Sequence, residues 1–311
     1  MGGAMSWVSE RHLVSALSNA GGFGVIACGA MSHDLLESEI AATKTMTDKP
    51  FGVNLIIMHP QLDELVEVCA RQGVSHVVLA GGIPKGSTLS RINEFARAIC
   101  FAPSARIGEK LVKMGAGALV IEGSEAGGHI GPVSTSVLAQ EILPEIHEVP
   151  VFVAGGIGRG EAIVAFLEMG ASGVQLGTRF VCAEESIAHE NFKKLFIKSN
   201  ARDAMASVQV DPDFPVIPVR AVVNKATEAF TRTQHEVIAR YRSGAVEKKD
   251  AQLEIEHFWA GALRKAVIDG DVENGSVMAG QSVGMVTKIQ PMQEIIDELV
   301  AQAEAFIAAR G

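Results

Sequence analysis

Cysteine is scarce in this sequence of 311 residues, and so are the features that mark metal-binding, secreted or membrane proteins. The four cysteines (Cys28, Cys69, Cys100 and Cys182) lie far apart, with no CxxC pair and no histidine at metal-ligand spacing. This spacing predicts neither a zinc site nor a disulfide framework. No stretch of 18 or more apolar residues occurs, and the N-terminus lacks a basic segment followed by a long apolar one. We therefore expect neither export nor a membrane-spanning helix, and a cytoplasmic location fits.

Positive charge is also in short supply. The 27 lysines and arginines are outnumbered by 36 aspartates and glutamates, which gives a formal net charge of -9. Without a basic excess or a basic run, the chain has no electrostatic footprint for a nucleic acid. A small-molecule substrate is the better expectation. The hydrophobic fraction of 48% is ample for a buried core.

Short apolar runs alternate with amphipathic segments over the first 190 residues, which is typical of βα units. Each run is apolar enough to be covered on both sides. The seven expected strands are Phe23–Cys28, Phe51–Ile57, His76–Ala80, Ala98–Ala102, Ala118–Glu122, Val151–Ala154 and Gly173–Leu176.

The boundaries of the intervening helices are marked by capping residues. Short side-chain oxygens can accept from the unpaired N–H groups of a first helical turn, so we expect N-caps at Ser9, Ser32 and Ser104. Glycines that adopt a left-handed conformation should end four helices, at Gly21, Gly73, Gly115 and Gly170.

Seven strands fit either a doubly wound sheet or a barrel that lacks one strand. The start of the chain favours the barrel. Residues 1–7 are loop-like and Ser9–Ala20 is helical, so the chain opens as if it followed a strand. Either the sequence is truncated at its start, or its first residues act as a stub strand. The predicted fold is a (β/α)₈ barrel, an α/β fold, with its first strand missing or shortened.

The pattern changes after residue 189. Residues 190–275 carry no convincing strand, Gln234–Tyr241 and Leu253–Asp269 look helical, and three prolines exclude regular structure from Val210–Val219. We expect a cofactor-binding barrel over residues 1–189 and a small helical lid over residues 190–275. Residues 276–311 should include a helix at Pro291–Ala309 that packs back on the barrel.

Two glycine-rich strand ends predict a phosphate site. Gly155 and Gly156 follow one strand, and Gly177 and Thr178 follow the next. In a barrel, the loops after the last two strands bind phosphate, because glycines let backbone N–H groups approach the anion. The alternative is that these glycines only form tight turns.

A histidine loop is the strongest candidate for chemistry. His129 follows a strand end and is flanked by Gly127, Gly128 and Gly131, so we expect it on a flexible, open loop at the catalytic face. A histidine there can transfer a proton near neutral pH, although a merely solvated loop histidine is the alternative.

Three further polar residues lie near strand ends. Glu122 could bond ligand hydroxyls, whereas Glu125 is expected to be solvated, and Asn54 could bond the edge of a ring or simply form a turn.

An ordered series of motifs resembles one family. The motifs are Gly3-Ala-Met-Ser-Trp7, Asn19-Ala-Gly-Gly22, Lys49-Pro-Phe-Gly-Val-Asn54, Glu122-Gly-Ser-Glu-Ala-Gly-Gly-His-Ile-Gly131, Ala154-Gly-Gly-Ile157 and Leu176-Gly-Thr-Arg-Phe180. Together they resemble the nitronate monooxygenases (2-nitropropane dioxygenases) and the related flavin-dependent enoyl-acyl-carrier-protein reductases. The histidine loop, Ala102-Pro-Ser104 and Gly275–Gln281 are closer to the reductase branch.

The resemblance implies a barrel that binds FMN non-covalently. It implies His129 as the acid/base and no metal. The expected cofactor-binding residues are Ala4, Met5, Ser6 and Asn54 near the isoalloxazine, Gly155, Gly156, Gly177 and Thr178 on the phosphate, and Glu122, Ala154 and Gln175 at the strand ends beside them.

Two activities use these parts. A nitronate monooxygenase would oxidise alkyl nitronates with O₂, with no need for a nicotinamide. An enoyl reductase would use NAD(P)H and an enoyl thioester, with His129 supplying a proton. The sequence places nitronate oxidation first. A non-catalytic barrel that binds a phosphate ligand is the third hypothesis. The oligomeric state stays open, a homodimer included.

Overall fold

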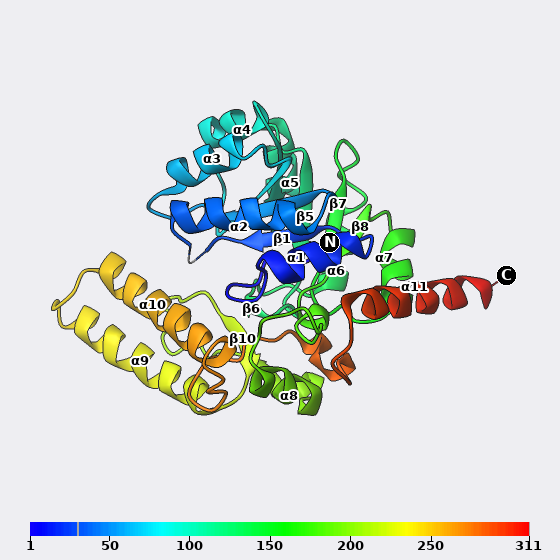
Figure 1. Cartoon of the computed structure of the whole chain (residues 1–311). Helices are drawn as coiled ribbons and strands as arrows, with labels where there is room; N and C mark the ends of the chain where they lie inside the picture. Colours follow the sequence, from blue (N-terminus) through cyan, green and yellow to red (C-terminus); the bar gives the residue numbers. More distant parts are fainter. Residues whose placement is uncertain (30, 311) are drawn as a thin grey trace.

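A computed structural model describes residues 1–29 and 31–310 of the chain, and its centre is a curled parallel sheet (Figure 1). The sheet has the order β1-β2-β3-β4-β5-β7-β8, as expected for successive right-handed βα units. Its strands are β1 Gly24–Ala27, β2 Phe51–Ile56, β3 His76–Ala80, β4 Arg97–Phe101, β5 Ala118–Glu122, β7 Val151–Ala154 and β8 Gly173–Gln175.

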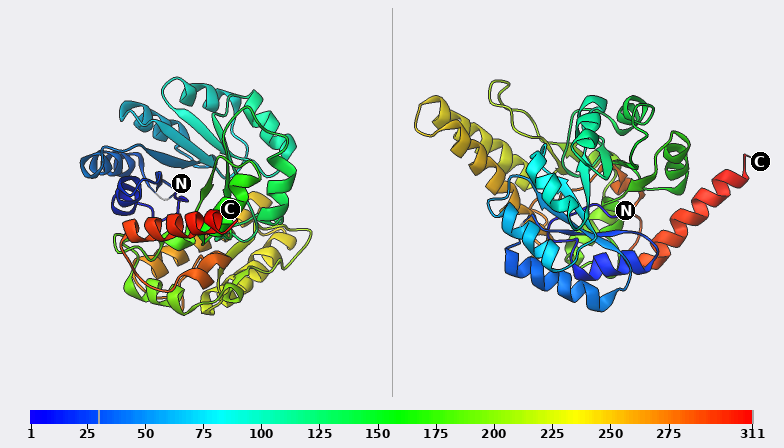
Figure 2. Two further views of the ribbon diagram at one scale, coloured as in Figure 1. Left: turned by 90° about the vertical axis from the view of Figure 1, so that its right-hand side faces the viewer. Right: turned by 90° about the horizontal axis from the view of Figure 1, so that it is seen from above.

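Helices surround this sheet on the outside (Figure 2). The first eight are α1 Arg11–Asn19, α2 His33–Met46, α3 Leu62–Arg71, α4 Gly86–Asn93, α5 Ala105–Lys113, α6 Thr135–Ile142, α7 Gly160–Glu168 and α8 Glu190–Lys198. One core cluster packs the strands against these helices, and a second fills the interior of the curled sheet with residues such as Val78, Ile99 and Val120. The fold is therefore a TIM-barrel-like α/β fold, as the sequence predicts.

The first three residues lie in the gap between β8 and β1. The α-amino group of Met1 donates to the Val174 carbonyl at 2.9 Å, and the Leu176 N–H donates to the Met1 carbonyl at 3.0 Å. On the other side, the Gly2 N–H donates to the Phe23 carbonyl at 2.8 Å. Residues 1–3 thus form the stub strand that joins the two edges of the sheet.

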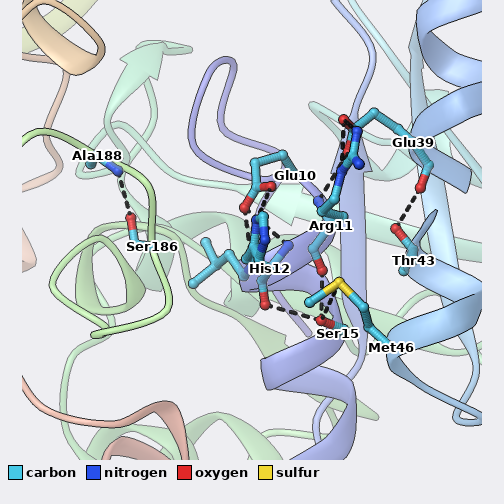
Figure 3. Close-up of polar contacts among 10 residues, drawn as sticks. Glu10, Arg11, His12, Ser15, Glu39, Thr43, Met46, Ser186 and Ala188 are labelled. Atoms are coloured by element: carbon cyan, nitrogen blue, oxygen red, sulfur yellow. Dashed lines mark hydrogen bonds and ion pairs between the residues drawn. The ribbon is translucent and has the colours of Figure 1, made fainter.

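The N-cap of helix α1 (Arg11–Asn19) is Glu10, one residue later than expected. Ser9 is not the N-cap, because the Glu10 carboxylate accepts from the backbone N–H groups of both His12 and Leu13. Figure 3 shows Glu10 beside His12 at the start of this helix. The Ser9 hydroxyl instead accepts from Met5 N–H and donates to the Gly3 carbonyl, each at 3.0 Å, which fixes the turn after the stub strand. The expected caps at Ser32 and Ser104 are confirmed. The four helix-ending glycines all have positive φ, from 58° to 104°.

A second, small sheet refutes the expectation that residues 190–275 lack strands. Strand β10 (Val219–Val222) pairs antiparallel with both β6 (Gly128–His129) and β9 (Ala204–Ala206). These strands are two to four residues long, and the pairing of β10 with β6 joins segments about 90 residues apart in the chain, so local sequence patterns could not reveal them.

Two long helices follow β10 and project to one side of the barrel (Figures 1 and 2). Helices α9 (Lys225–Arg242) and α10 (Lys248–Val267) pack on each other around aromatic residues that include Phe230 and Trp259. Both are longer at their amino ends than expected.

Helix α11 (Met292–Ala308) returns to pack along α7, where the Leu299 carbonyl would lie only 2.2 Å from a Cβ atom on Gly160. Short 3₁₀ turns are η1 Thr178–Phe180, η2 Ala201–Asp203 and η3 Gln281–Met285. None of the described helices is long and apolar enough to cross a membrane.

Candidate functional site

A cavity of about 540 Å³ opens at the carboxyl ends of the barrel strands. It brings together every site residue that the sequence predicted, from six segments of the chain. These residues are Ala4, Met5, Ser6, Asn54, Glu122, His129, Ala154, Gly155, Gly156, Gln175, Gly177 and Thr178. Their proximity follows from the parallel sheet, because the carboxyl ends of parallel strands meet at one edge. The roles of the individual residues stay predictions.

The glycines at the predicted phosphate end leave little room for side chains. Gly155 and Gly156 have φ values of 100° and 70°, a left-handed conformation that disfavours other residues. A Cβ atom on Gly156 would lie 3.0 Å from the Cβ of Glu125, and one on Gly177 would lie 3.3 Å from the Met5 sulfur. The two strand ends therefore present bare backbone to the cavity.

Thr178 is oriented by a segment from the far end of the chain. Its hydroxyl oxygen accepts from the Gly280 N–H at 2.9 Å, so the hydroxyl proton can be donated to a ligand. A Cβ atom on Gly280 would approach the Glu125 carbonyl to 2.8 Å, so only glycine fits this crossing. The contribution of Gly280 to the site was not predicted, although Gly275–Gln281 belongs to the resemblance.

Polar side chains without protein partners face the cavity from two strands. Glu122 on β5 is in register with Ala154 on β7, which is in register with Gln175 on β8. Gln175 is only 6% exposed, and neither its amide nor the Glu122 carboxyl group has a hydrogen-bond partner among the described residues. Both side chains thus present unpaired polar atoms to the cavity, which suits a polar ligand. Asn54 differs, because its amide donates to the Val78 carbonyl at 3.4 Å.

Burial raises the pKa of Glu122 from 4.5 to about 7, because the charged form loses its hydration. Near neutral pH this carboxyl group can therefore donate a hydrogen bond as well as accept one. Titratable groups with shifted pKa values that line a cavity are candidates for function.

Replacing Glu122 by glutamine tests the raised pKa. The folded chain keeps a proton that the unfolded chain loses, so this group destabilises the fold progressively as the pH rises from about 4.5 to 7, and the penalty is constant above that range. Glutamine cannot ionise. We expect Glu122→Gln to be stabilised relative to the unchanged protein by roughly 1–3 kcal/mol at pH 8 and by much less at pH 5. Urea unfolding of the flavin-free proteins measures both values, and an equal difference at the two pH values would contradict the assignment.

His129 lies in a short strand that is hydrogen-bonded to β10, and not in a flexible loop as expected. Its backbone pairs with Val219 of β10, and the adjacent Ile130 N–H donates to the Pro218 carbonyl at 3.0 Å. Gly127 packs so closely on the chain that a Cβ atom there would lie 2.5 Å from the Gly280 nitrogen. The side chain of His129 is exposed to the cavity. The strand thus positions the imidazole while leaving it accessible.

Two charged side chains hold this histidine segment in place. Glu125 is not simply solvated, because its Oε2 atom accepts from both the N–H and the hydroxyl of Thr135 at 2.9 Å. Arg220 is buried on β10 and donates to the Ser124 carbonyl at 2.9 Å and the Ala204 carbonyl at 2.6 Å. The segment is anchored on both sides.

Several residues of the cavity were missed by the sequence analysis. Trp7 lines it with a φ of 66°, the one positive value among the described non-glycine residues, and its ring lies 5.8 Å from the guanidinium of Arg264. Helix α10 lines it with Trp259, Leu263 and Val267, whose spacing of four residues was a visible but ordinary helical signal. Ile217 and Met278 complete this apolar wall.

Comparisons with known proteins identify relatives over the whole length of the chain. The family model described as nitronate monooxygenase matches residues 1–73 and 61–302. A relative from Mycobacterium tuberculosis, (3aS,4S,5R,7aS)-5-hydroxy-7a-methyl-1-oxo-octahydro-1H-indene-4-carboxyl-CoA dehydrogenase, is 30% identical over 96% of this chain and 91% of its own. A probable nitronate monooxygenase from Staphylococcus saprophyticus is 27% identical over 85% and 88% of the two chains.

Solved structures agree with this result. FabK from Thermotoga maritima is 32% identical, covers 99% of this chain and 93% of its own, and superposes with a TM-score of 0.88. A nitroalkane oxidase from Streptomyces ansochromogenes, at 23% identity and a TM-score of 0.81, supports the fold alone. The chain therefore belongs to the nitronate monooxygenase family of flavin-type oxidoreductases, close to its FabK branch.

Proposed function

We propose that this protein is an FMN-dependent oxidoreductase that reduces an α,β-unsaturated acyl thioester. The proposal rests on one observation, which is that the cavity has a polar side and an apolar side. Its barrel side has bare glycine backbone and unpartnered polar groups, whereas its other side is the apolar wall of α10. The first side suits a phosphorylated polar cofactor, and the second suits the hydrocarbon part of a substrate.

The described residues fit FMN. Gly155, Gly156, Gly177 and Thr178 would bind its phosphate through backbone N–H groups and one hydroxyl. Ala4, Met5, Ser6 and Asn54 would lie near the ring system. Glu122 and Gln175, on either side of Ala154, would hydrogen-bond the polar groups of the cofactor, which would give Gln175 the partner that it lacks in the protein.

The side chains supply what the cofactor cannot. FMN, when bound, would provide the hydride chemistry that amino acids do not offer, with NAD(P)H as the source of electrons. His129 would act as a general acid and deliver a proton to the α-carbon of the thioester. Its backbone is fixed by pairing with β10, and its side chain lines the cavity. The apolar wall would exclude water and hold the acyl chain over the barrel opening.

Oxidation of a nitronate is the second candidate, and it is the one that the sequence alone places first. The description of the family model and the Staphylococcus saprophyticus relative favour it. In this case His129 would deprotonate or orient the substrate. The apolar wall favours the thioester, since a small anionic nitronate leaves most of that wall uncovered. The Mycobacterium tuberculosis relative, named for a carboxyl-CoA compound, supports the same preference.

Anaerobic mixing of the purified flavoprotein with candidate substrates distinguishes these activities. We expect NADH or NADPH to bleach the flavin absorbance and an enoyl thioester to restore it. Bleaching by a nitronate but by neither nicotinamide would instead establish the second candidate. Purified protein without a visible flavin spectrum would favour the non-catalytic phosphate-binding barrel.

We further propose that residues 190–275 form a lid on a barrel of residues 1–189, and that residues 276–311 form a C-terminal segment whose helix α11 packs back on the barrel. Leu263 is the residue to change, because it is nearly buried in the middle of the α10 wall. Leu263→Phe should lower kcat/KM for a bulky acyl thioester about 10- to 100-fold more than for a four-carbon one, since it removes space from the acyl site. Leu253 on the same helix is half exposed and outside the cavity lining, so Leu253→Phe is the matched control. Equal effects on both substrates would refute the lid role.

A further inference from the structure

The predicted phosphate site has no positively charged lysine or arginine side chain in its described lining. The phosphate of FMN carries nearly two negative charges at neutral pH. The described residues that line the cavity include no lysine and no arginine, so the phosphate end is lined by backbone N–H groups and one hydroxyl. Enclosing an anion away from water is costly unless a positive charge compensates it. A positive charge just outside the lining would therefore strengthen the binding that the backbone N–H groups provide.

Arg179 is placed to supply that charge. We call the two glycine-rich strand ends, Gly155–Gly156 and Gly177–Thr178, the glycine cradle. Arg179 follows Thr178 directly in η1, so its backbone adjoins one half of this cradle. The side chain is 1% exposed, and an arginine keeps its positive charge even when buried. Two of its donor atoms, Nε and Nη1, have no hydrogen-bond partner among the described residues. An arginine buried without full pairing is costly, which indicates a role beyond packing.

A polar network connects Arg179 to the other half of the cradle. Its Nη2 atom donates to Glu298 Oε2 on α11 at 2.9 Å. Glu298 also accepts from Gln302 at 3.2 Å, and Gln302 in turn accepts from the Gly160 N–H at 2.9 Å, where α7 begins after the Gly155–Gly156 turn. Through α11, this network links η1, which follows the β8 strand end, with the start of α7, which follows the β7 strand end. Glu298 is 40% exposed, so solvent weakens its neutralisation of the buried arginine.

Two other buried cationic side chains, Arg220 and Lys193, already donate hydrogen bonds to backbone carbonyls. Arg220 donates to the carbonyls of Ser124 and Ala204, and the Lys193 ammonium donates to the Ala183 carbonyl at 2.7 Å. Among these buried cations, Arg179 alone keeps unpartnered donor atoms while adjoining the cradle.

We propose that Arg179 is the charge-compensating residue of the phosphate site and that Glu298 limits its effect, so that the pair sets the preference for FMN over riboflavin. This inference rests on the proposed use of FMN. It assigns Arg179 a positioning and electrostatic role, with no contact to the reacting atoms.

Titration of flavin-free protein with FMN and with riboflavin tests the proposal, because the two ligands differ only in the phosphate. Arg179→Met should weaken FMN binding about tenfold, the order of magnitude expected for the loss of one nearby charge at an effective dielectric constant of about 20, and leave riboflavin binding nearly unchanged. Arg179→Lys, which keeps the charge, should restore much of the preference. Glu298→Gln should change the FMN-to-riboflavin ratio in the opposite direction, to about threefold tighter FMN binding.

The surface pair Arg310 and Glu168 provides matched controls, since Arg310→Met and Glu168→Gln should change neither affinity.

Equal losses for both ligands in Arg179→Met would make Arg179 merely structural and overturn the proposal. If Arg179→Met does not fold, Glu298→Gln decides, because an unchanged or lower preference for FMN contradicts the assigned charge. If the unchanged protein binds neither flavin, the proposed function fails as well, whereas FMN binding with an unmoved ratio refutes only this inference.

Discussion

Replacing His129 by alanine is expected to lower turnover by about 10²- to 10⁴-fold on a substrate that needs proton transfer, such as an enoyl thioester. The flavin should stay bound, because the proposed contacts with phosphate and ring do not include the imidazole. On a preformed nitronate, from which the proton is already gone, the loss should be smaller than on the neutral nitroalkane. Steady-state kinetics on the three substrates, together with the flavin absorbance of the variant, measure both effects.

Two outcomes would contradict the acid/base role. If His129→Ala loses flavin and activity together, His129 is structural. If it keeps full turnover on every substrate, Glu122 becomes the next candidate, since its raised pKa of about 7 also suits proton transfer. His147→Ala is the control, since His147 lies outside the cavity lining and should be replaceable without effect.

Valine at Gly156 or at Gly177 is expected to remove most of the bound flavin. Its side chain would stand where the phosphate must approach the backbone, and at Gly156 it would also meet Glu125 at 3.0 Å. Flavin content per chain, measured from the absorbance of the purified variants, should fall by about tenfold or more, the loss expected when one or two charge-assisted hydrogen bonds to the phosphate are broken. The circular dichroism spectrum should stay close to that of the unchanged protein.

Matched glycines separate phosphate binding from backbone strain. Gly170 has a φ of 104° and open space around its Cβ position, so Gly170→Val imposes similar strain away from the cavity. Gly131 has no neighbour within 4 Å of a Cβ atom and an unstrained φ, so Gly131→Val is the control for Gly177. Full flavin content in Gly177→Val would refute the phosphate assignment.

The barrel and the cavity could be predicted because their signals are local. The strands are short apolar runs, and positive-φ glycines such as Gly73 and Gly115 end the helices between them. Parallel strands place all their carboxyl ends at one edge, so residues as distant as Asn54 and Gly177 could be assigned to one cavity without coordinates.

The features that escaped prediction depend on contacts between distant segments. His129 was expected on a flexible loop because its pairing with Val219 involves a two-residue strand, which carries no periodic signal. Gly280 reaches Thr178 across about 100 residues. Serine is a favoured N-cap and glutamate is not, so Ser9 was the natural prediction; Ser9 is instead used by the turn that it holds at Gly3 and Met5, and Glu10 caps the helix.

The identity of the flavin in the purified protein tests the central claim most directly. Heat denaturation should release a flavin that runs as FMN on chromatography, at close to one equivalent per chain, because the cavity has a single glycine cradle for one phosphate beside the polar row of Glu122 and Gln175. Release of FAD, or protein that can be neither isolated with FMN nor loaded with it, would contradict the account.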